Sequence, residues 1–142
     1  MRADAFVDTN VLLYAMSTAP DEAAKRQQAR AILRQPDWGV SIQVLQEFYA
    51  NATRPPQPAM QHEDAEATIV QLLLRPVADG NAALVLEALR LKARYQLSYW
   101  DAAIVAAALQ LGASVLYSED LQAGQVFEGV RVVNPFLPDT AN

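Results

Sequence analysis

Ala5-Phe6-Val7-Asp8-Thr9-Asn10 is the stretch that decides the fold, because an apolar strand ends there abruptly in a carboxylate. Residues 11–16 that follow are apolar without alternation, which is typical of a buried helix. Asp8 therefore stands at a switch from strand to helix, the place where open α/β sheets bind their ligands. Asp8 or Asn10 could instead simply cap the helix, since both residue types are favoured there. The other side chains that reach the same edge decide between these interpretations.

The composition indicates one soluble domain. At 142 residues the chain can bury roughly two thirds of its unfolded surface, and we expect a single core over residues 1–138 and a frayed tail at 139–142. The longest apolar runs are far too short for a membrane span, and the start of the chain does not resemble a secretory signal. Cysteine is absent, which excludes disulfides, thiolate metal sites and cysteine nucleophiles. We therefore expect a cytoplasmic protein without membrane contact.

The formal net charge of −5 ordinarily argues against a nucleic-acid partner, because phosphate binding requires lysine and arginine. The location of the charge matters more than its sum. Four carboxylates gathered at one site and neutralised by bound cations would account for most of it, and the objection would then largely disappear.

Strands alternate with helices along the chain, which implies a parallel sheet with helices on both faces. Pro76 favours an edge position for its strand. The pattern predicts a three-layer α/β/α sandwich with a parallel sheet of four or five strands, the central one being 5–7. The predicted strands are 5–7, 38–40, 75–77, 114–117 and 130–133, and the predicted helices are 11–16, 20–33, 42–52, 63–74, 81–95 and 98–111.

Two helix surfaces indicate contacts beyond the core. Arg26, Arg30 and Arg34 recur every four residues and form a basic stripe, which is usually a solvated face and less often a place for an RNA backbone or an acidic partner. The helix at 81–95 carries more apolar residues than one narrow stripe can bury. We expect this helix to be buried on two sides or to contribute to a dimer contact.

Four acidic residues can reach the carboxyl edge of the sheet. Asp8 and Asp120 each follow a buried strand. Asp101 lies in the first turn of a helix, and Glu47 lies near the start of the helix after the second strand. Each also has a purely structural interpretation, since Asp101 fits a capping box with Ser98, Glu47 fits a surface position and Asp120 fits a turn. Taken singly, the structural interpretation is the simpler one for Asp101 and Glu47.

Taken together, the four acidic segments resemble the PIN domain ribonucleases, in particular the VapC-type toxins of bacterial toxin-antitoxin pairs. The resemblance covers essentially the whole chain, and the order, spacing and local context of the acidic positions all match. The matching segments are Phe6-Val7-Asp8-Thr9-Asn10, Ser41-Ile42-Gln43-Val44-Leu45-Gln46-Glu47-Phe48, Tyr99-Trp100-Asp101-Ala102-Ala103-Ile104 and Tyr117-Ser118-Glu119-Asp120-Leu121.

The resemblance implies a Mg²⁺- or Mn²⁺-dependent endoribonuclease that hydrolyses RNA phosphodiester bonds as the toxin of a toxin-antitoxin pair. It also implies a homodimer, held inactive by a small antitoxin protein. In the pair Glu119-Asp120 either acid could face the metal, and the family position is Asp120. The implied catalytic and metal-binding residues are Asp8, Glu47, Asp101 and Asp120, with Asn10 and Ser118 as polar support.

The chemistry of these side chains agrees with a metal-dependent nuclease. Hard divalent cations prefer oxygen ligands, and Mg²⁺ usually keeps several waters while taking few carboxylates. Such a cation can neutralise a phosphodiester and lower the pKa of an attacking water. The lone His62, with no second histidine or cysteine, argues against a zinc site or a serine-histidine triad, and we expect it to face solvent.

Other functions fit the sequence less well. A phosphoryl-transfer enzyme of the haloacid dehalogenase type needs a second aspartate where this chain has Asn10. A response-regulator receiver needs an acidic pair at the first strand and a lysine after a later strand, and neither is present. The remaining alternative is a non-catalytic PIN-like module that binds RNA or protein, because a fold alone does not fix function.

Overall fold

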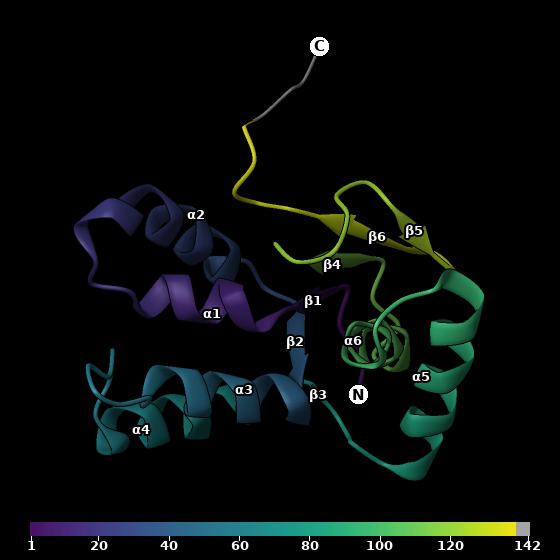
Figure 1. The fold of residues 1–142 in the computed structure, drawn as a ribbon, viewed down its shortest axis with the longest axis horizontal. Coiled ribbons are helices and arrows are strands. Elements are labelled where there is room, and N and C mark those ends of the chain that lie inside the picture. The colour runs from purple at the N-terminus through teal and green to yellow at the C-terminus, as the bar shows by residue number, and fades with distance from the viewer. Residues whose placement is uncertain (139–142) are drawn as a thin grey trace.

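The computed structural model describes residues 1–138, and its helices lie on either side of a central sheet, so the predicted three-layer sandwich is confirmed (Figure 1). In Figure 1 the helices α1 to α4 lie to the left of strands β1 and β2, and α5 and α6 lie to the right. The predicted tail at 139–142 lies outside the described residues. The helices are α1 (Thr9–Met16), α2 (Ala23–Arg34), α3 (Ile42–Ala52), α4 (His62–Leu72), α5 (Ala82–Tyr95) and α6 (Tyr99–Gln110), with a 3₁₀ turn over Pro20–Glu22.

The strand order β3-β2-β1-β4-β6-β5 places β1 inside the sheet, as predicted. Strand β1 pairs in parallel with β2 and β4, so that Phe6 lies opposite Gly39 on one side and Leu116 on the other. Because these strands end at the same edge, the residues that follow β1 and β4 meet there. The strands are β1 (Ala5–Val7), β2 (Trp38–Ser41), β3 (Val77–Ala78), β4 (Val115–Tyr117), β5 (Val126–Phe127) and β6 (Val130–Val133).

Among residues 1–138 the sheet has six strands, so the prediction of a parallel sheet of four or five strands was wrong at one edge. The additional strand β5 pairs antiparallel with β6. The turn between them has Glu128 and Gly129 at positive φ, 53° and 95°, and positive φ at both central positions suits the twist of a two-residue hairpin. The two residues of β5 are too few to produce an alternating pattern, so no strand was predicted at this position.

Capping side chains fix where the helices begin. Ser41 accepts a hydrogen bond from the Val44 N–H at the start of α3. Asn81 does the same for the Leu84 N–H, so that α5 begins at Ala82. These caps satisfy backbone donors that have no partner within the first turn.

Helix α6 lies at the centre of the packing because it is buried almost all round. Its residues 102–108 are all buried, and most of them are alanines. Small side chains allow α6 to pack closely between the sheet and α5, which lies beside it in Figure 1. No helix among residues 1–138 is both long and apolar enough to cross a membrane.

Gly39 in β2 provides a test of this packing. A Cβ at Gly39 would lie 2.5 Å from the Pro76 carbonyl oxygen and 2.7 Å from Leu111 Cδ1, so the neighbouring backbone would have to move. We expect Gly39→Ala to lower the free energy of unfolding by about 1–3 kcal/mol, as overpacking does in other cores. Urea unfolding measures the difference.

Gly80→Ala is the matched control for that substitution. A Cβ at Gly80 meets no atom within 4 Å, and its backbone is not at positive φ. Its free energy of unfolding should stay within about 0.5 kcal/mol of the parent or rise slightly. Equal stability of the two variants would contradict the described packing of β2 against Pro76 and Leu111.

Candidate active site

Asp8 lies at the junction of β1 and α1 and is 5% exposed. One of its oxygens, Oδ1, accepts a hydrogen bond of 2.7 Å from the Thr9 N–H. The other, Oδ2, accepts one of 2.8 Å from the Ser118 hydroxyl. Asp8 is thus the N-cap of α1 and is also joined to the strand that neighbours β1, so both interpretations of this residue apply at once.

Ser118 connects the end of β4 to this carboxylate and is fully buried. Its hydroxyl donates to Asp8 and accepts from the backbone N–H groups of Asp120 at 3.2 Å and Leu121 at 3.4 Å. A single hydroxyl therefore fixes the turn after β4 relative to the end of β1. The supporting role in catalysis that the family resemblance implies for Ser118 stays a prediction.

Glu47 reaches the same edge from α3. The Thr9 hydroxyl donates a hydrogen bond of 2.8 Å to Glu47 Oε1, while the Thr9 backbone N–H donates to Asp8. Thr9 therefore holds both carboxylates with two different groups. Sequence reasoning did not single out Thr9, although its position directly after Asp8 was the available signal.

Glu119 and Asp120 have different partners, which separates the two acids of this pair. Glu119 accepts a hydrogen bond of 2.7 Å from Lys25 and one of 2.9 Å from the Tyr14 hydroxyl. Asp120 lies near Asn10, whose side chain favours the charged form of Asp120 and so opposes part of the rise in its pKa described below. Because both oxygens of Glu119 are engaged, Asp120 is the better candidate for the fourth acid of the site.

Asp101 lies in the first turn of α6, and only half of the predicted capping box forms. The Asp101 backbone N–H donates to the Ser98 hydroxyl oxygen at 3.1 Å. Within the described residues the Asp101 carboxylate makes no hydrogen bond. Asp101 therefore takes part in the cap of α6 through its backbone N–H alone, and its carboxylate remains available to a ligand.

The pKa of Asp8 is raised to about 6, chiefly because burial disfavours the charged form. The hydrogen bonds from Ser118 and Thr9 oppose this rise, and the charges of Asp120 and Glu47 add to it. Two other acids, Asp120 after β4 and Glu47 on α3, therefore lie close enough to Asp8 for their charges to affect its pKa.

The pKa of Asp120 is also raised, first by burial and then by the charges of Asp101, Glu119 and Glu47. Asp101 on α6 and Glu47 on α3 therefore both act on Asp120. Hydrogen bonds link Asp8 to Glu47 through Thr9 and to the loop of Asp120 through Ser118, and Asp101 lies near enough to Asp120 for its charge to raise the pKa of Asp120.

The donor set suits a hard divalent cation. Among residues 1–138, no lysine or arginine forms an ion pair with Asp8, Glu47, Asp101 or Asp120. No three acidic or histidine side chains in this part of the chain are arranged to hold a metal ion together. Mg²⁺ needs only one or two carboxylates, because waters and substrate oxygens complete its shell. The oxygen donors and their uncompensated charge therefore fit Mg²⁺ or Mn²⁺ with a mostly hydrated shell.

The arginine stripe on α2 is engaged with the protein itself at two of its three positions. Arg26 donates to the Ser17 carbonyl at 3.1 Å, and Arg30 donates to the Ala15 carbonyl at 2.9 Å. Both carbonyls lie at the C-terminal end of α1, where basic side chains satisfy the last acceptors of a helix. A role of Arg26, Arg30 and Arg34 in RNA binding stays a prediction.

His62, the single histidine of the chain, is exposed, as predicted. Its Nδ1 is 2.8 Å from the Tyr49 hydroxyl, a contact between the start of α4 and α3. His62 therefore joins two helices.

Comparison with known proteins identifies the fold and the family. The sequence model of the family described as PIN domain matches residues 5–126. No curated protein sequence shows a significant match.

Several solved structures share the fold. A toxin-antitoxin complex from Klebsiella pneumoniae has a TM-score of 0.67 at 21% identity and covers 93% of this chain and 98% of that one. The Mycobacterium tuberculosis toxin VapC20, which cleaves the sarcin-ricin loop, has a TM-score of 0.64 at 22% identity, covering 82% and 89%. DNA-bound VapBC from Salmonella typhimurium has a TM-score of 0.64 at 18% identity, covering 93% and 97%. At these identities the similarity shows the fold.

The raised pKa of Asp8 predicts a pH-dependent cost to folding. An aspartate in an unfolded chain titrates near pH 4, so between about pH 4 and 6 the folded state binds the extra proton. The free energy of unfolding should fall as the pH rises through this window, by up to about 3 kcal/mol from this group, and this contribution should stay level above it. Asp8→Asn, which can still cap α1, should lose this part of the dependence and be at least as stable as the parent at pH 8.

Urea unfolding between pH 4 and pH 8 measures both profiles. Glu63→Gln, at an exposed acid in the first turn of α4, is the control and should follow the parent. Parallel profiles for the parent and Asp8→Asn would show that Asp8 carries no such cost.

Proposed function

Because the chain belongs to the PIN domain family, we propose that it is a Mg²⁺- or Mn²⁺-dependent endoribonuclease and the toxin of a toxin-antitoxin pair. The observation that carries this proposal is the convergence of Asp8, Glu47, Asp101 and Asp120 from four different elements without a neutralising lysine or arginine among the described residues. Such charge is costly to a fold unless a cation offsets it.

The four carboxylates are the candidate ligands of the cation. Because no three acidic side chains among residues 1–138 are arranged to hold one ion together, one or two of them would bind it directly and the others would act through its waters. When bound, Mg²⁺ or Mn²⁺ neutralises the phosphodiester, lowers the pKa of the attacking water and stabilises the leaving oxygen. The chain supplies the orientation: Thr9 and Ser118 fix both oxygens of Asp8, and Thr9 also fixes Glu47. The carboxylates are therefore already oriented before the reaction and need not move during it. Preorganisation of this kind lowers the activation free energy.

The similarity to solved structures supports the toxin assignment. VapC20 is described as a toxin that cleaves the sarcin-ricin loop, and the structures from Klebsiella pneumoniae and Salmonella typhimurium are complexes of toxin-antitoxin type. We extend that role to this chain as a proposal. The acidic site would then be covered by an antitoxin with a basic or amphipathic segment, because such a segment matches its charge.

A homodimer is the second part of the proposed assembly. Two helices present apolar side chains to solvent: Val70, Leu73 and Leu74 on and just after α4, and Val85, Leu86 and Leu89 on α5. Helix α5 therefore buries only one side in a single chain, with Ala88 and Leu91 in the core. Exposed apolar patches of this kind mark contact surfaces in soluble proteins.

Removal of any one of the four carboxylates should abolish RNA cleavage. We expect Asp8→Asn, Glu47→Gln, Asp101→Asn and Asp120→Asn each to reduce metal-dependent cleavage of a structured RNA panel by about 100-fold or more. Asp101→Asn should fold as well as the parent, because the cap bond comes from its backbone N–H. Gel analysis of cleavage with Mg²⁺, with Mn²⁺ and with EDTA measures the effect.

Glu87→Gln is the control for these substitutions, since Glu87 pairs with Arg90 on α5 and contacts none of the four acids. It should cleave RNA as the parent does. Fully active Asp8→Asn or Asp101→Asn protein would contradict the proposed chemistry. Binding of RNA without any metal-dependent cleavage by the parent would favour the alternative of a non-catalytic binding module.

The proposed assembly predicts a mass near twice the 15.6 kDa of one chain. Light scattering of the purified protein measures this mass. Leu74→Glu and Leu86→Glu each place a charge on one of the two apolar faces, and the variant that disrupts the interface should yield the monomer mass. A monomeric parent that also forms no complex when co-expressed with a small protein encoded beside it would contradict both proposed partners.

A further inference from the structure

Tyr14, Lys25, Glu119 and Phe136 form a cluster beside the candidate site, here called the Lys25 cluster. Lys25 Nζ lies 2.7 Å from Glu119 Oε2 and 3.1 Å from the Tyr14 hydroxyl oxygen, and that hydroxyl donates to Glu119 Oε1 at 2.9 Å. The Lys25 ammonium also lies 4.6 Å from the centre of the Tyr14 ring and 5.6 Å from that of Phe136. The two rings meet edge to face at 4.8 Å.

The Lys25 cluster joins four parts of the chain that are distant in sequence. Tyr14 belongs to α1, Lys25 to α2, Glu119 to the loop after β4, and Phe136 to the segment after β6. Both oxygens of Glu119 are held, so this side chain has a fixed direction. The next residue is Asp120, whose N–H donates to the Ser118 hydroxyl oxygen at 3.2 Å.

We propose that Lys25 and Tyr14 are positioning residues that act through Glu119. By holding Glu119 they fix the loop 118–121 in the conformation that presents Asp120 to the candidate site. The part of this inference that concerns metal binding rests on the proposed function. Neither residue touches the reacting groups in this role.

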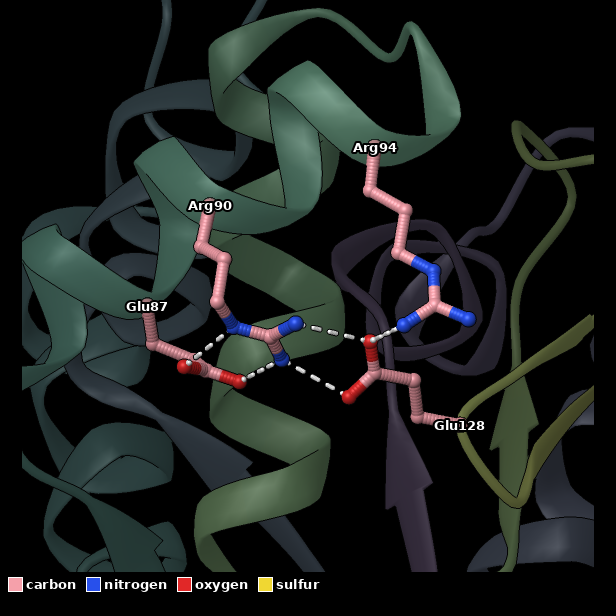
Figure 2. A network of polar contacts seen from close by, with 4 residues as sticks. All are labelled: Glu87, Arg90, Arg94 and Glu128. Atoms are coloured by element: carbon pink, nitrogen blue, oxygen red, sulfur yellow. Dashed lines mark hydrogen bonds and ion pairs between the residues drawn. The ribbon is translucent and has the colours of Figure 1, made fainter.

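A second ion-pair network lies elsewhere, with similar distances between its closest charged atoms, and serves as the matched control. Figure 2 shows Arg90 on α5 between Glu87 and Glu128, with Arg94 beside it. Arg90 Nη2 lies 2.6 Å from Glu87 and 2.7 Å from Glu128. This network joins α5 to the turn between β5 and β6 and contacts none of the four acids. Its loss should affect stability without affecting the loop 118–121.

The test compares Lys25→Met, Lys25→Arg and Arg90→Met in two measurements. Hydrogen exchange of the metal-free protein follows the amides of Asp120 and Leu121, and calorimetric titration with Mn²⁺ alone gives the dissociation constant. We expect Lys25→Met to accelerate exchange at both amides and to weaken Mn²⁺ binding about tenfold, as loss of an orienting partner does in other metal sites. Lys25→Arg, which can keep the ion pair, should stay within about twofold of the parent.

Arg90→Met should leave both readouts unchanged even if its melting temperature falls. Tyr14→Phe, which removes one hydrogen bond from Glu119 and keeps the ring, should shift both readouts in the same direction as Lys25→Met but less. It provides the measurement if Lys25→Met does not fold.

The outcomes separate this inference from the proposed function. Unchanged exchange at 120 and 121 in Lys25→Met or Tyr14→Phe, or an equal change in Arg90→Met, would overturn the positioning role even if the parent cleaves RNA. If the parent neither binds Mn²⁺ nor cleaves RNA, the proposed function fails. Faster exchange in Lys25→Met alone would then still support the fixing of the loop.

Discussion

The buried carboxylate of Asp8 is the constraint on which the rest of the site depends. A charge that is only 5% exposed requires partners for both oxygens, and these come from the first turn of α1 and from the end of β4. The two hydrogen bonds fix Asp8 and also fix the positions of Thr9 and Ser118, which in turn hold Glu47 and the loop that carries Asp120. The hydrogen bonds do not fully offset the cost of burial, because the pKa of Asp8 remains raised to about 6.

The order of the strands explains why acids that are distant in sequence meet at this edge. Strand β1 lies between β2 and β4, so the chain leaves the sheet beside Asp8 on both sides, into α3 with Glu47 and into the loop with Asp120. Asp101 arrives separately, from the first turn of α6, and acts on Asp120 through its charge. The fold therefore places negative charge at one end of the sheet while its hydrophobic core occupies the rest, and this separation allows a charged site in a stable domain.

Much of this arrangement could be predicted from the sequence, because strong local signals mark it. The apolar stretch before Asp8 predicted the central strand, and Ser98 predicted the start of α6. What the sequence could not resolve depended on partners far along the chain. The choice between Glu119 and Asp120 rests on Lys25, which is 94 residues from Glu119. The spacing of Arg26 and Arg30 likewise gave no sign that both donate to carbonyls at the end of α1. Strand β5 was missed because its two residues carry no periodicity. Strand β3 is equally short, but it overlaps the longer segment predicted at 75–77.

A crystal structure of the protein soaked with Mn²⁺ tests the central claim most directly, since anomalous scattering locates the ion independently of activity. The account predicts an anomalous peak at the carboxyl edge of the sheet, within coordination distance of Asp8 and of at least one of Glu47, Asp101 and Asp120, and absent from Asp8→Asn crystals. A peak at another position that persists in Asp8→Asn, or no peak in the parent at millimolar Mn²⁺, would contradict it.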